Sequence, residues 1–221
     1  LTDDISIGEA AQQLEYSMQI AIPGPKMAYG LLLFVCIALA ISGIGAFDAL
    51  TWFLEVIWVF AGLILIVWRW KKFPLTKLLC IALAIHALVL MYGGHYTYAE
   101  TPLGLWAKET FDLSRNHYDR LGHFMQGFVP AILVRELLLR TSPLKRGVWL
   151  AVLTTCACLA FSAFFEMIEW WAALVWGGAA DAFLATQGDV WDTQWDMFCA
   201  LCGAIISQLV LAKWHNKQLG L

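Results

Sequence analysis

Residues 31–72 read LLLFVCIALAISGIGAFDALTWFLEVIWVFAGLILIVWRWKK. They contain two apolar runs, each close to the roughly 20 residues that a helix needs to cross the hydrocarbon core of a bilayer. A short link at 47–49 without Lys or Arg separates the runs, whereas Arg69, Lys71 and Lys72 follow the second one. The stretch therefore predicts a pair of membrane-spanning helices.

The composition of the whole chain has the same character. Of its 221 residues, 61% are hydrophobic and only 14% are charged, whereas soluble domains are nearer 45–50% and 25%. The mean hydropathy is +0.69. A net charge of -3 gives no electrostatic reason to expect a nucleic-acid partner. We therefore expect an all-α, polytopic membrane protein.

Six apolar stretches predict a bundle of six transmembrane helices in one domain, 26–221, after an amphipathic or flexible segment at 1–25. The fourth stretch is the weakest, because it contains Asp119, His123 and Glu136. It can span only where other helices surround it, since lipid does not solvate such groups. The expected spans are 27–47, 49–69, 75–92, 118–139, 148–176 and 194–214.

The distribution of Lys and Arg predicts the orientation of these helices. Cytoplasmic loops carry an excess of both residues, and they occur between spans two and three, between spans four and five, and after span six. The link at 47–49 and the stretch 177–193 contain neither residue. Both termini should therefore be cytoplasmic.

Three pairs of polar residues are the strongest functional signal. Each pair has i,i+3 or i,i+4 spacing, which places both side chains on one side of a helix. In the expected topology, all three pairs lie near the outer ends of their helices. Ionisable groups inside a membrane are costly and usually serve ion, proton or substrate handling. The pairs are Asp119 and His123, Glu166 and Glu169, and Asp192 and Asp196.

Five carboxylates in one small volume cannot all remain ionised without compensation. Protonation, the nearby Arg115 and Arg120, or a bound metal can supply it. Carboxylates with one imidazole suit a divalent cation such as Mg, Mn, Ca or Zn. The absence of a Glu-x-x-His motif argues against the usual di-iron site. The predicted metal ligands are His123, Glu166, Glu169, Asp192 and Asp196, and the predicted catalytic residues are Asp119, His123 and Glu166.

Structural interpretations of the same residues remain open. The polar groups can form a hydrogen-bonded network that only fixes helix packing, and Asp189 or Asp192 can cap the last helix. The Cys199-x-x-Cys202 spacing matches redox and zinc motifs, but buried free cysteines behave as small hydrophobic residues. The connection 93–117 predicts a short helix on the outer surface, which either covers a site or anchors at the interface.

Three blocks in the second half of the chain resemble the YjdF-like family of bacterial inner-membrane proteins. They begin at Tyr118-Asp119-Arg120-Leu121-Gly122-His123, at Phe165-Glu166-Met167-Ile168-Glu169-Trp170 and at Gln187-Gly188-Asp189-Val190-Trp191-Asp192. More distantly, Asp119-Arg120-x-x-His123 is similar to the Asp-Lys-x-x-His block of VanZ-like proteins, with Arg in place of Lys. The resemblance implies a helical protein of the bacterial inner membrane, and it names no substrate.

Three functions are compatible with these features. The first is a metal-dependent enzyme that acts on a membrane lipid or a lipid-linked head group at the outer leaflet. The second is a non-enzymatic protein that binds a lipid or assembles with a partner membrane protein. The third is a proton- or cation-coupled transporter, which needs a polar route to the cytoplasmic side. Only Arg135 and Glu136 offer such a route in the sequence.

Overall fold

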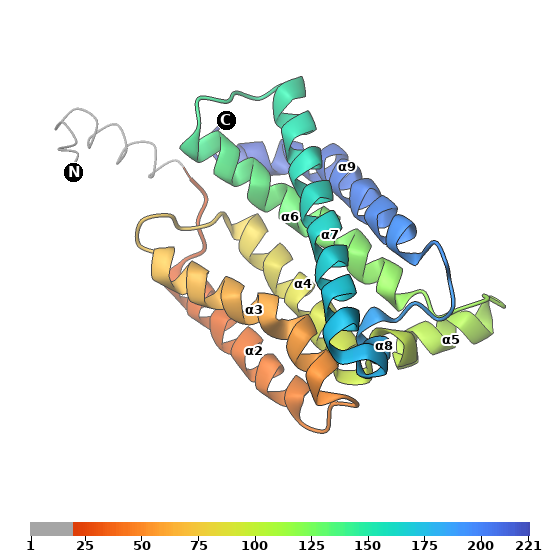
Figure 1. Ribbon diagram of the computed structural model, residues 1–221. Coiled ribbons are helices and arrows are strands. Elements are labelled where there is room, and N and C mark those ends of the chain that lie inside the picture. Colours follow the sequence, from red (N-terminus) through yellow and green to blue (C-terminus); the bar gives the residue numbers. More distant parts are fainter. Residues whose placement is uncertain (1–19) are drawn as a thin grey trace.

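The computed structural model describes residues 20–221, and all regular structure in this range is helical (Figure 1). Most of the expected N-terminal segment, 1–19, lies outside the described residues. The α-helices are α2 (Pro25–Gly43), α3 (Ala49–Arg69), α4 (Lys77–Tyr96), α5 (Pro102–Thr110), α6 (Tyr118–Thr141), α7 (Val148–Trp176), α8 (Asp181–Leu184) and α9 (Asp192–Gln218), with 3-10 helices η1 (Tyr98–Glu100) and η2 (Gly177–Ala180).

Each of the six expected spans forms one long helix. Five of them, α2, α3, α4, α7 and α9, are long and apolar enough to cross a membrane. The remaining helix, α6, has the length, with 24 residues, but its ionisable side chains make it too polar to qualify by composition alone. Both α4 and α9 extend beyond the predicted limits, so that Asp192 belongs to the first turn of α9.

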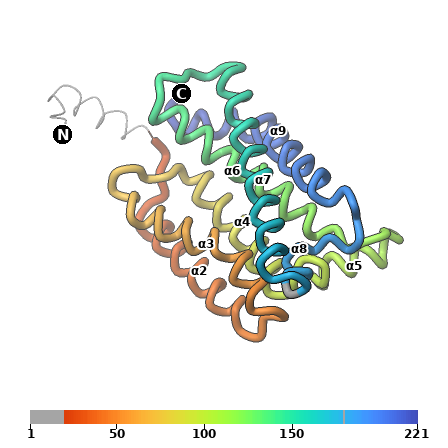
Figure 2. Tube along the Cα trace, in the orientation of Figure 1, coloured from red at the N-terminus to blue at the C-terminus, as the bar shows by residue number. Residues whose placement is uncertain are grey.

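The helices form two groups that meet at α4. Helices α2 and α3 pack against α4 on one side, and α6 packs against its other side. Helix α6 in turn lies along α9 and beside α7 (Figure 2). Helix α6 thus has helical neighbours on several sides, as a polar helix in a membrane requires.

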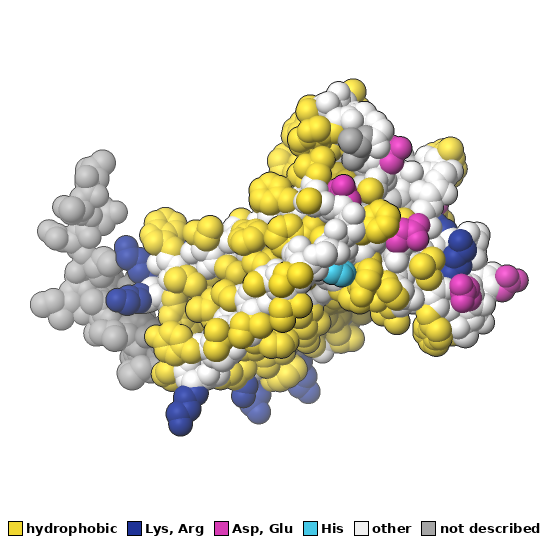
Figure 3. All heavy atoms as spheres, turned by 90° about the horizontal axis from the view of Figure 1, so that it is seen from below, with side chains coloured by type: hydrophobic (Ala, Val, Ile, Leu, Met, Phe, Trp, Pro, Cys, Tyr) yellow, Lys and Arg dark blue, Asp and Glu magenta, His cyan; other side chains and the backbone are white. Residues whose placement is uncertain are grey.

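The chain direction brings like charges together at the two ends of the bundle. We call the end where α3, α6 and α9 finish the basic end, and the end where α6 and α9 begin the acidic end. In Figure 3, most of the visible Lys and Arg side chains lie along the left and lower edges, while most acidic groups lie toward the right. The basic end carries Arg69, Lys71, Lys72, Lys77, Arg140, Lys145, Arg146, Lys213 and Lys217.

Two glycines allow α6 and α9 to approach until their backbones touch. A Cβ added to Gly127 of α6 would lie 1.8 Å from the carbonyl oxygen of Ala200. A Cβ added to Gly203 of α9 would lie 2.1 Å from the carbonyl oxygen of Phe124. Small residues permit such crossings in membrane helices. This close contact places the polar turns of α6 directly against the first turns of α9.

A buried polar cluster joins three helices at the basic end. Glu136 of α6 is fully buried and accepts hydrogen bonds from the backbone N–H and the hydroxyl of Thr76, at 3.0 and 2.7 Å. Arg140 donates to the same carboxylate at 2.7 Å, and Nε2 of His215 lies 3.1 Å from it. His215 is fully buried although it lies in the last turn of α9, because it completes this cluster.

The connection between α4 and α6 contains the short helix that the sequence predicts. Helix α5 exposes Leu103 and Trp106, and Phe111 directly after it is also exposed. Buried Asn116 fixes this segment, because its side-chain amide donates to the carbonyl oxygens of Ala99 and Thr101. The exposed apolar side chains are typical of a helix at a membrane interface.

Candidate functional site

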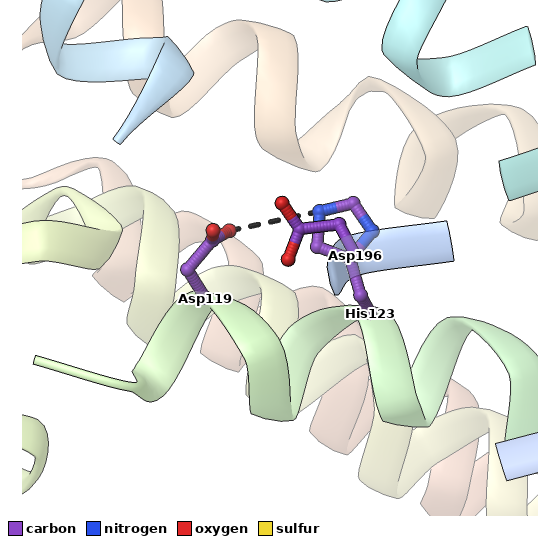
Figure 4. A group of neighbouring side chains, drawn as sticks. All are labelled: Asp119, His123 and Asp196. Atoms are coloured by element: carbon purple, nitrogen blue, oxygen red, sulfur yellow. Dashed lines mark ion pairs between the residues drawn. The ribbon is translucent and has the colours of Figure 1, made fainter. Parts of the chain in front are cut away.

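Helix α6 places Asp119 and His123 one turn apart on the same buried face. Nε2 of His123 lies 3.6 Å from Oδ1 of Asp119, and its Nδ1 lies 3.0 Å from Oε1 of Gln126. Figure 4 shows both side chains close to Asp196, which comes from α9. One oxygen or nitrogen atom from each of Asp119, His123 and Asp196 lies within 4.8 Å of the others. The spacing is suitable for a metal ion.

Helix α7 adds the second predicted pair on the other side of His123. Oε1 of Glu166 lies 3.8 Å from Nδ1 of His123. His123, Glu166 and Glu169 form another group whose candidate ligand atoms all lie within 4.8 Å of one another. His123 therefore connects two carboxylate groups that the sequence placed at the same depth on three different helices. We call Asp119, His123, Glu166, Glu169 and Asp196 the acidic cluster.

Two oxygen atoms of the acidic cluster have no hydrogen-bond partner among the described residues. They are Oε1 of Glu166 and Oδ1 of Asp196, and both residues are buried, with exposed fractions of 8% and 2%. Buried polar atoms in proteins are almost always paired. A carboxylate without a donor is compensated by a proton, by ordered water or by a cation. Both oxygen atoms are therefore free to accept a proton, an ordered water or a cation.

Asp192 lies in a different environment from the other predicted ligands. Its carboxylate forms a short ion pair with buried Arg115, and it belongs to neither candidate metal group. Arg115 also donates to the carbonyl oxygen of Ala185 at 3.0 Å and lies 3.8 Å from Asp119. Arg115, one of the two cations proposed from the sequence, therefore neutralises Asp192 at the edge of the acidic cluster.

The other proposed cation, Arg120, pairs with a loop residue. Arg120 donates to Asp189 at 2.5 Å and lies over the ring of Trp195. The backbone N–H of Trp191 and the charge of Arg120 hold the pKa of Asp189 below its ordinary value. Burial and the two arginines lower the pKa of His117, directly before α6. We call Arg115, Arg120, Asp189 and Asp192 the arginine network.

A cavity of about 50 Å³ lies beside the acidic cluster. One water molecule needs roughly 10–15 Å³ measured in this way, so the cavity has room for about four. Its wall combines polar groups with aromatic rings and comes from α3, α4, η1, α6 and α7. The lining residues are Glu55, Trp58, His86, Leu90, Tyr98, Asp119, Gly122, His123, Gln126, Phe161, Phe165 and Glu169.

Three residues of this wall lie outside the polar pairs that the sequence analysis singled out: Glu55, His86 and Gln126. Helical pair spacing does not select Glu55 or His86, because each is a lone polar residue in an apolar span. The buried Nε2 of His86 has no hydrogen-bond partner among the described residues. A lone polar residue in an apolar span is the signal that could have found these two.

Comparison with known proteins identifies relatives. Residues 27–217 match the family model described as "Predicted membrane protein (DUF2238)". The chain is 50% identical over 178 residues to a protein described as "Inner membrane protein YjdF" from Escherichia coli (strain K12). That alignment covers 80% of this chain and 85% of the relative. No solved structure matches.

These matches confirm the resemblance found in the three sequence blocks. The family model extends from α2 to the last turn of α9 and includes every residue of the acidic cluster. Together with five helices of spanning length, the inner-membrane relative shows a multi-pass protein of the bacterial inner membrane. The chain belongs to the DUF2238 family of predicted membrane proteins, which includes YjdF.

Proposed function

We propose that the acidic cluster binds a divalent cation and that the protein is a metal-dependent enzyme acting on a lipid or lipid-linked head group. The observation that carries this proposal is the pair of ligand groups that share His123. Oxygens of Glu166 and Asp196 without partners add to it. A bound cation lowers the pKa of coordinated water and binds phosphate oxygens, which are the two requirements for hydrolysis of a phosphorylated head group.

The residues take distinct roles in this proposal. His123, Glu166, Glu169 and Asp196 supply ligand atoms. Asp119, at 3.6 Å from the imidazole, orients His123 and fixes its tautomer. The alternative role for His123 is the general base, with Glu166 assisting proton transfer. Asp192 is retained by Arg115 in the structure, so we place it behind the ion rather than in contact with it.

The proposal includes an orientation in the membrane. The basic end faces the cytoplasm, because Lys and Arg concentrate there, and the acidic end faces outward. Helix α6 then also crosses the membrane, as the fourth of six spans in chain order, and its neighbours α4, α7 and α9 keep its ionisable groups away from lipid. Both termini lie on the cytoplasmic side.

Metal analysis of the detergent-purified protein tests the ion site. We expect near-stoichiometric divalent metal in the wild type, and its loss in Glu166→Gln and Asp196→Asn. Glu109→Gln is the matched control, because Glu109 is an exposed carboxylate on α5 outside the acidic cluster, and it should retain the metal. Metal-free wild-type protein, after supply of Mg, Mn, Ca and Zn, would contradict the proposal.

A second assay tests the chemistry. Wild-type protein is incubated with phospholipids and lipid-linked phosphates in detergent, and release of phosphate or of the head group is measured with and without chelator. Hydrolysis that requires metal and is lost in His123→Gln supports the enzyme. Metal binding without turnover of any of these lipids favours the non-enzymatic binding protein instead.

A transporter is the second candidate, and one observation favours it. Fully buried Glu136 and His215 form a second ionisable pair at the basic end, which the sequence did not reveal as a pair. Charges at both depths are a feature of ion pathways through membranes. Proton or cation flux into proteoliposomes, abolished by Glu136→Gln and by Glu166→Gln, would favour transport over catalysis.

A further inference from the structure

The cavity beside the acidic cluster is closed toward the acidic end by a wedged aromatic ring. Tyr98 is buried, and its ring fits between two glycines on neighbouring helices. A Cβ added to Gly93 of α4 would lie 2.4 Å from the Tyr98 ring, and one added to Gly122 of α6 would lie 2.7 Å from it. The two glycines therefore hold the ring tightly between α4 and α6.

The arginine network closes the same end beside Tyr98. Arg115 links Asp192 of α9 to the carbonyl oxygen of Ala185 in the loop before it. Arg120 ties Asp189 of that loop to α6. Opening a path here requires several charge-assisted hydrogen bonds to break, and these are the strong ones in proteins. Tyr98 and these ion pairs thus both obstruct entry to the cavity from the acidic end.

The wall between α3 and α7 is held much more weakly. Trp58 of α3 and Phe161 of α7 meet edge to face, with ring centroids 5.2 Å apart, and both residues are only half-buried. In the described part of the chain, no hydrogen bond or ion pair joins α3 to α7. The adjacent Ile57 and Phe164 are exposed apolar residues that would face lipid. Trp58 also lies 6.5 Å from the ring of Phe165, and Leu54 packs on the same apolar cluster. This wall thus separates the cavity from the bilayer by apolar and aromatic contacts.

The size of the cavity shows that a wall must open before any head group enters. About 50 Å³ accommodates an ion with a few waters, whereas pockets for small organic ligands are roughly 300–1,000 Å³. Separation of one aromatic pair enlarges the cavity on its lipid side. The other walls contain backbone contacts, a wedged ring or ion pairs, so the aromatic pair is the weakest closure.

The acidic side chains of the cavity wall favour a lipid head group that carries a positive charge. Glu55, Asp119 and Glu169 line the cavity, and none of the described lining residues is Lys or Arg. Aromatic rings such as Trp58 and Tyr98 attract ammonium groups through their faces. Glu55 lies on α3 and lines the same cavity as His123 of α6 and Glu169 of α7. An amine therefore suits the Glu55 side of the cavity.

We propose that Trp58 and Phe161 form a lateral gate through which the head group of an amine phospholipid enters from the adjoining leaflet. Its ammonium group approaches Glu55 and the aromatic rings, and its acyl chains remain in the bilayer between α3 and α7. This inference deepens the proposed function, because it names the class of lipid at the same site. The gate itself does not depend on a bound metal.

Access of thiol reagents tests the gate in proteoliposomes. The six native cysteines are replaced by alanine, and Leu90→Cys introduces one thiol into the cavity wall. N-phenylmaleimide reaches thiols through the bilayer, and a sulfonated maleimide reaches them only from water. Ala87→Cys, buried on α4 away from the cavity, and Glu109→Cys, exposed on α5, are the controls. His86→Cys replaces Leu90→Cys if the latter fails to fold.

We expect N-phenylmaleimide to label Leu90→Cys faster than Ala87→Cys, and the sulfonated reagent to label only Glu109→Cys. Adding Trp58→Ala should speed the apolar reaction about fivefold, the factor that corresponds to one lost aromatic pair. Phosphatidylethanolamine vesicles should slow it about threefold relative to phosphatidylglycerol vesicles, as expected for one cation–π contact.

Three results would overturn parts of this inference. Fast labelling of Leu90→Cys by the sulfonated reagent would show an aqueous entrance. An unchanged rate with Trp58→Ala would exclude the aromatic pair as the gate. Equal rates in the two kinds of vesicle would reject the amine head group. Metal content is measured on the same samples, so that loss of the proposed metal site is distinguished from loss of the gate.

Discussion

The two ends of the bundle each bury carboxylates, but they solve the electrostatic problem differently. At the basic end, the Glu136 carboxylate receives donors from Thr76, Arg140 and His215. In the acidic cluster, oxygens of Glu166 and Asp196 receive none from the described residues. The protein itself supplies the hydrogen-bond donors of the Glu136 carboxylate. The oxygens of Glu166 and Asp196 without donors can still accept a proton, a water molecule or a cation.

This difference indicates separate roles for the two clusters. A carboxylate with all its partners contributes to a unique packing of α4, α6 and α9, and removal of it leaves those partners unpaired. Carboxylates without partners lower stability until a ligand or proton compensates them. Such a local loss of stability is expected at a site whose residues serve binding rather than folding.

Loss of Glu136 should have the largest effect. Glu136→Ala leaves buried His215 and Thr76 without their acceptor, and breaking a buried charge cluster typically costs about 3–5 kcal/mol. The free energy of unfolding, measured by denaturant titration in mixed micelles, should fall by an amount in this range. Glu109→Ala is the exposed control and should change it little. Equal stability of the two variants would contradict the conclusion that the Glu136 cluster stabilises the packing of α4, α6 and α9.

A methyl group added at the contact between α6 and α9 should have the next largest effect on the free energy of unfolding. Gly127→Ala forces α6 away from the carbonyl of Ala200, and overpacking of this kind costs about 1–3 kcal/mol. Gly62→Ala in α3 meets nothing within 4 Å, and should instead stabilise the helix by up to about 1 kcal/mol. The same unfolding titration separates them. If the two substitutions act alike, α6 and α9 do not meet as closely as described.

Neutralising the acidic cluster should cost little in the absence of metal. Glu166→Gln and Asp196→Asn replace carboxylates that each have an oxygen without a hydrogen-bond partner. In the presence of chelator, we therefore expect the free energy of unfolding to change by no more than about 1 kcal/mol in either direction. Added metal should stabilise the wild type by mass action but not these variants. Melting temperatures measured with and without metal test this. If these variants lose as much stability in chelator as Glu136→Ala does, the acidic cluster stabilises the fold to the same extent as the Glu136 cluster, and the two roles are not separate.

The smallest expected effect is a pH dependence at the surface of the acidic end. Because the pKa of Asp189 is lowered in the fold, its contribution is complete above the unfolded value of about 3.9 and disappears as the pH falls through the folded value. Asp189→Asn should therefore melt below the wild type at pH 6, and the difference should shrink as the pH falls below the unfolded value of about 3.9. A constant difference over this range would show that ionisation of Asp189 plays no part.

Much of the candidate site was predictable because spacing and topology act together. The i,i+4 pair Asp119 and His123 lies on one helical face in any α-helix, and alternating helix direction brings Glu166 and Asp196 to the same end. Asp192 shows where this reasoning stops. It has the right spacing and depth, but it pairs with Arg115, whose position depends on a loop that has no periodic pattern.

The sequence by itself determined the helices, their approximate limits and the segregation of charge, because hydrophobic run length and helical period are local properties. Tertiary structure alone decided which polar groups share a wall. Glu55 reaches the cavity only because α3 packs on α4, and Trp58 meets Phe161 across 103 positions of the chain. Contacts between helices distant in sequence depend on side-chain shape at each crossing, as at Gly127 and Gly203, and no local pattern encodes them.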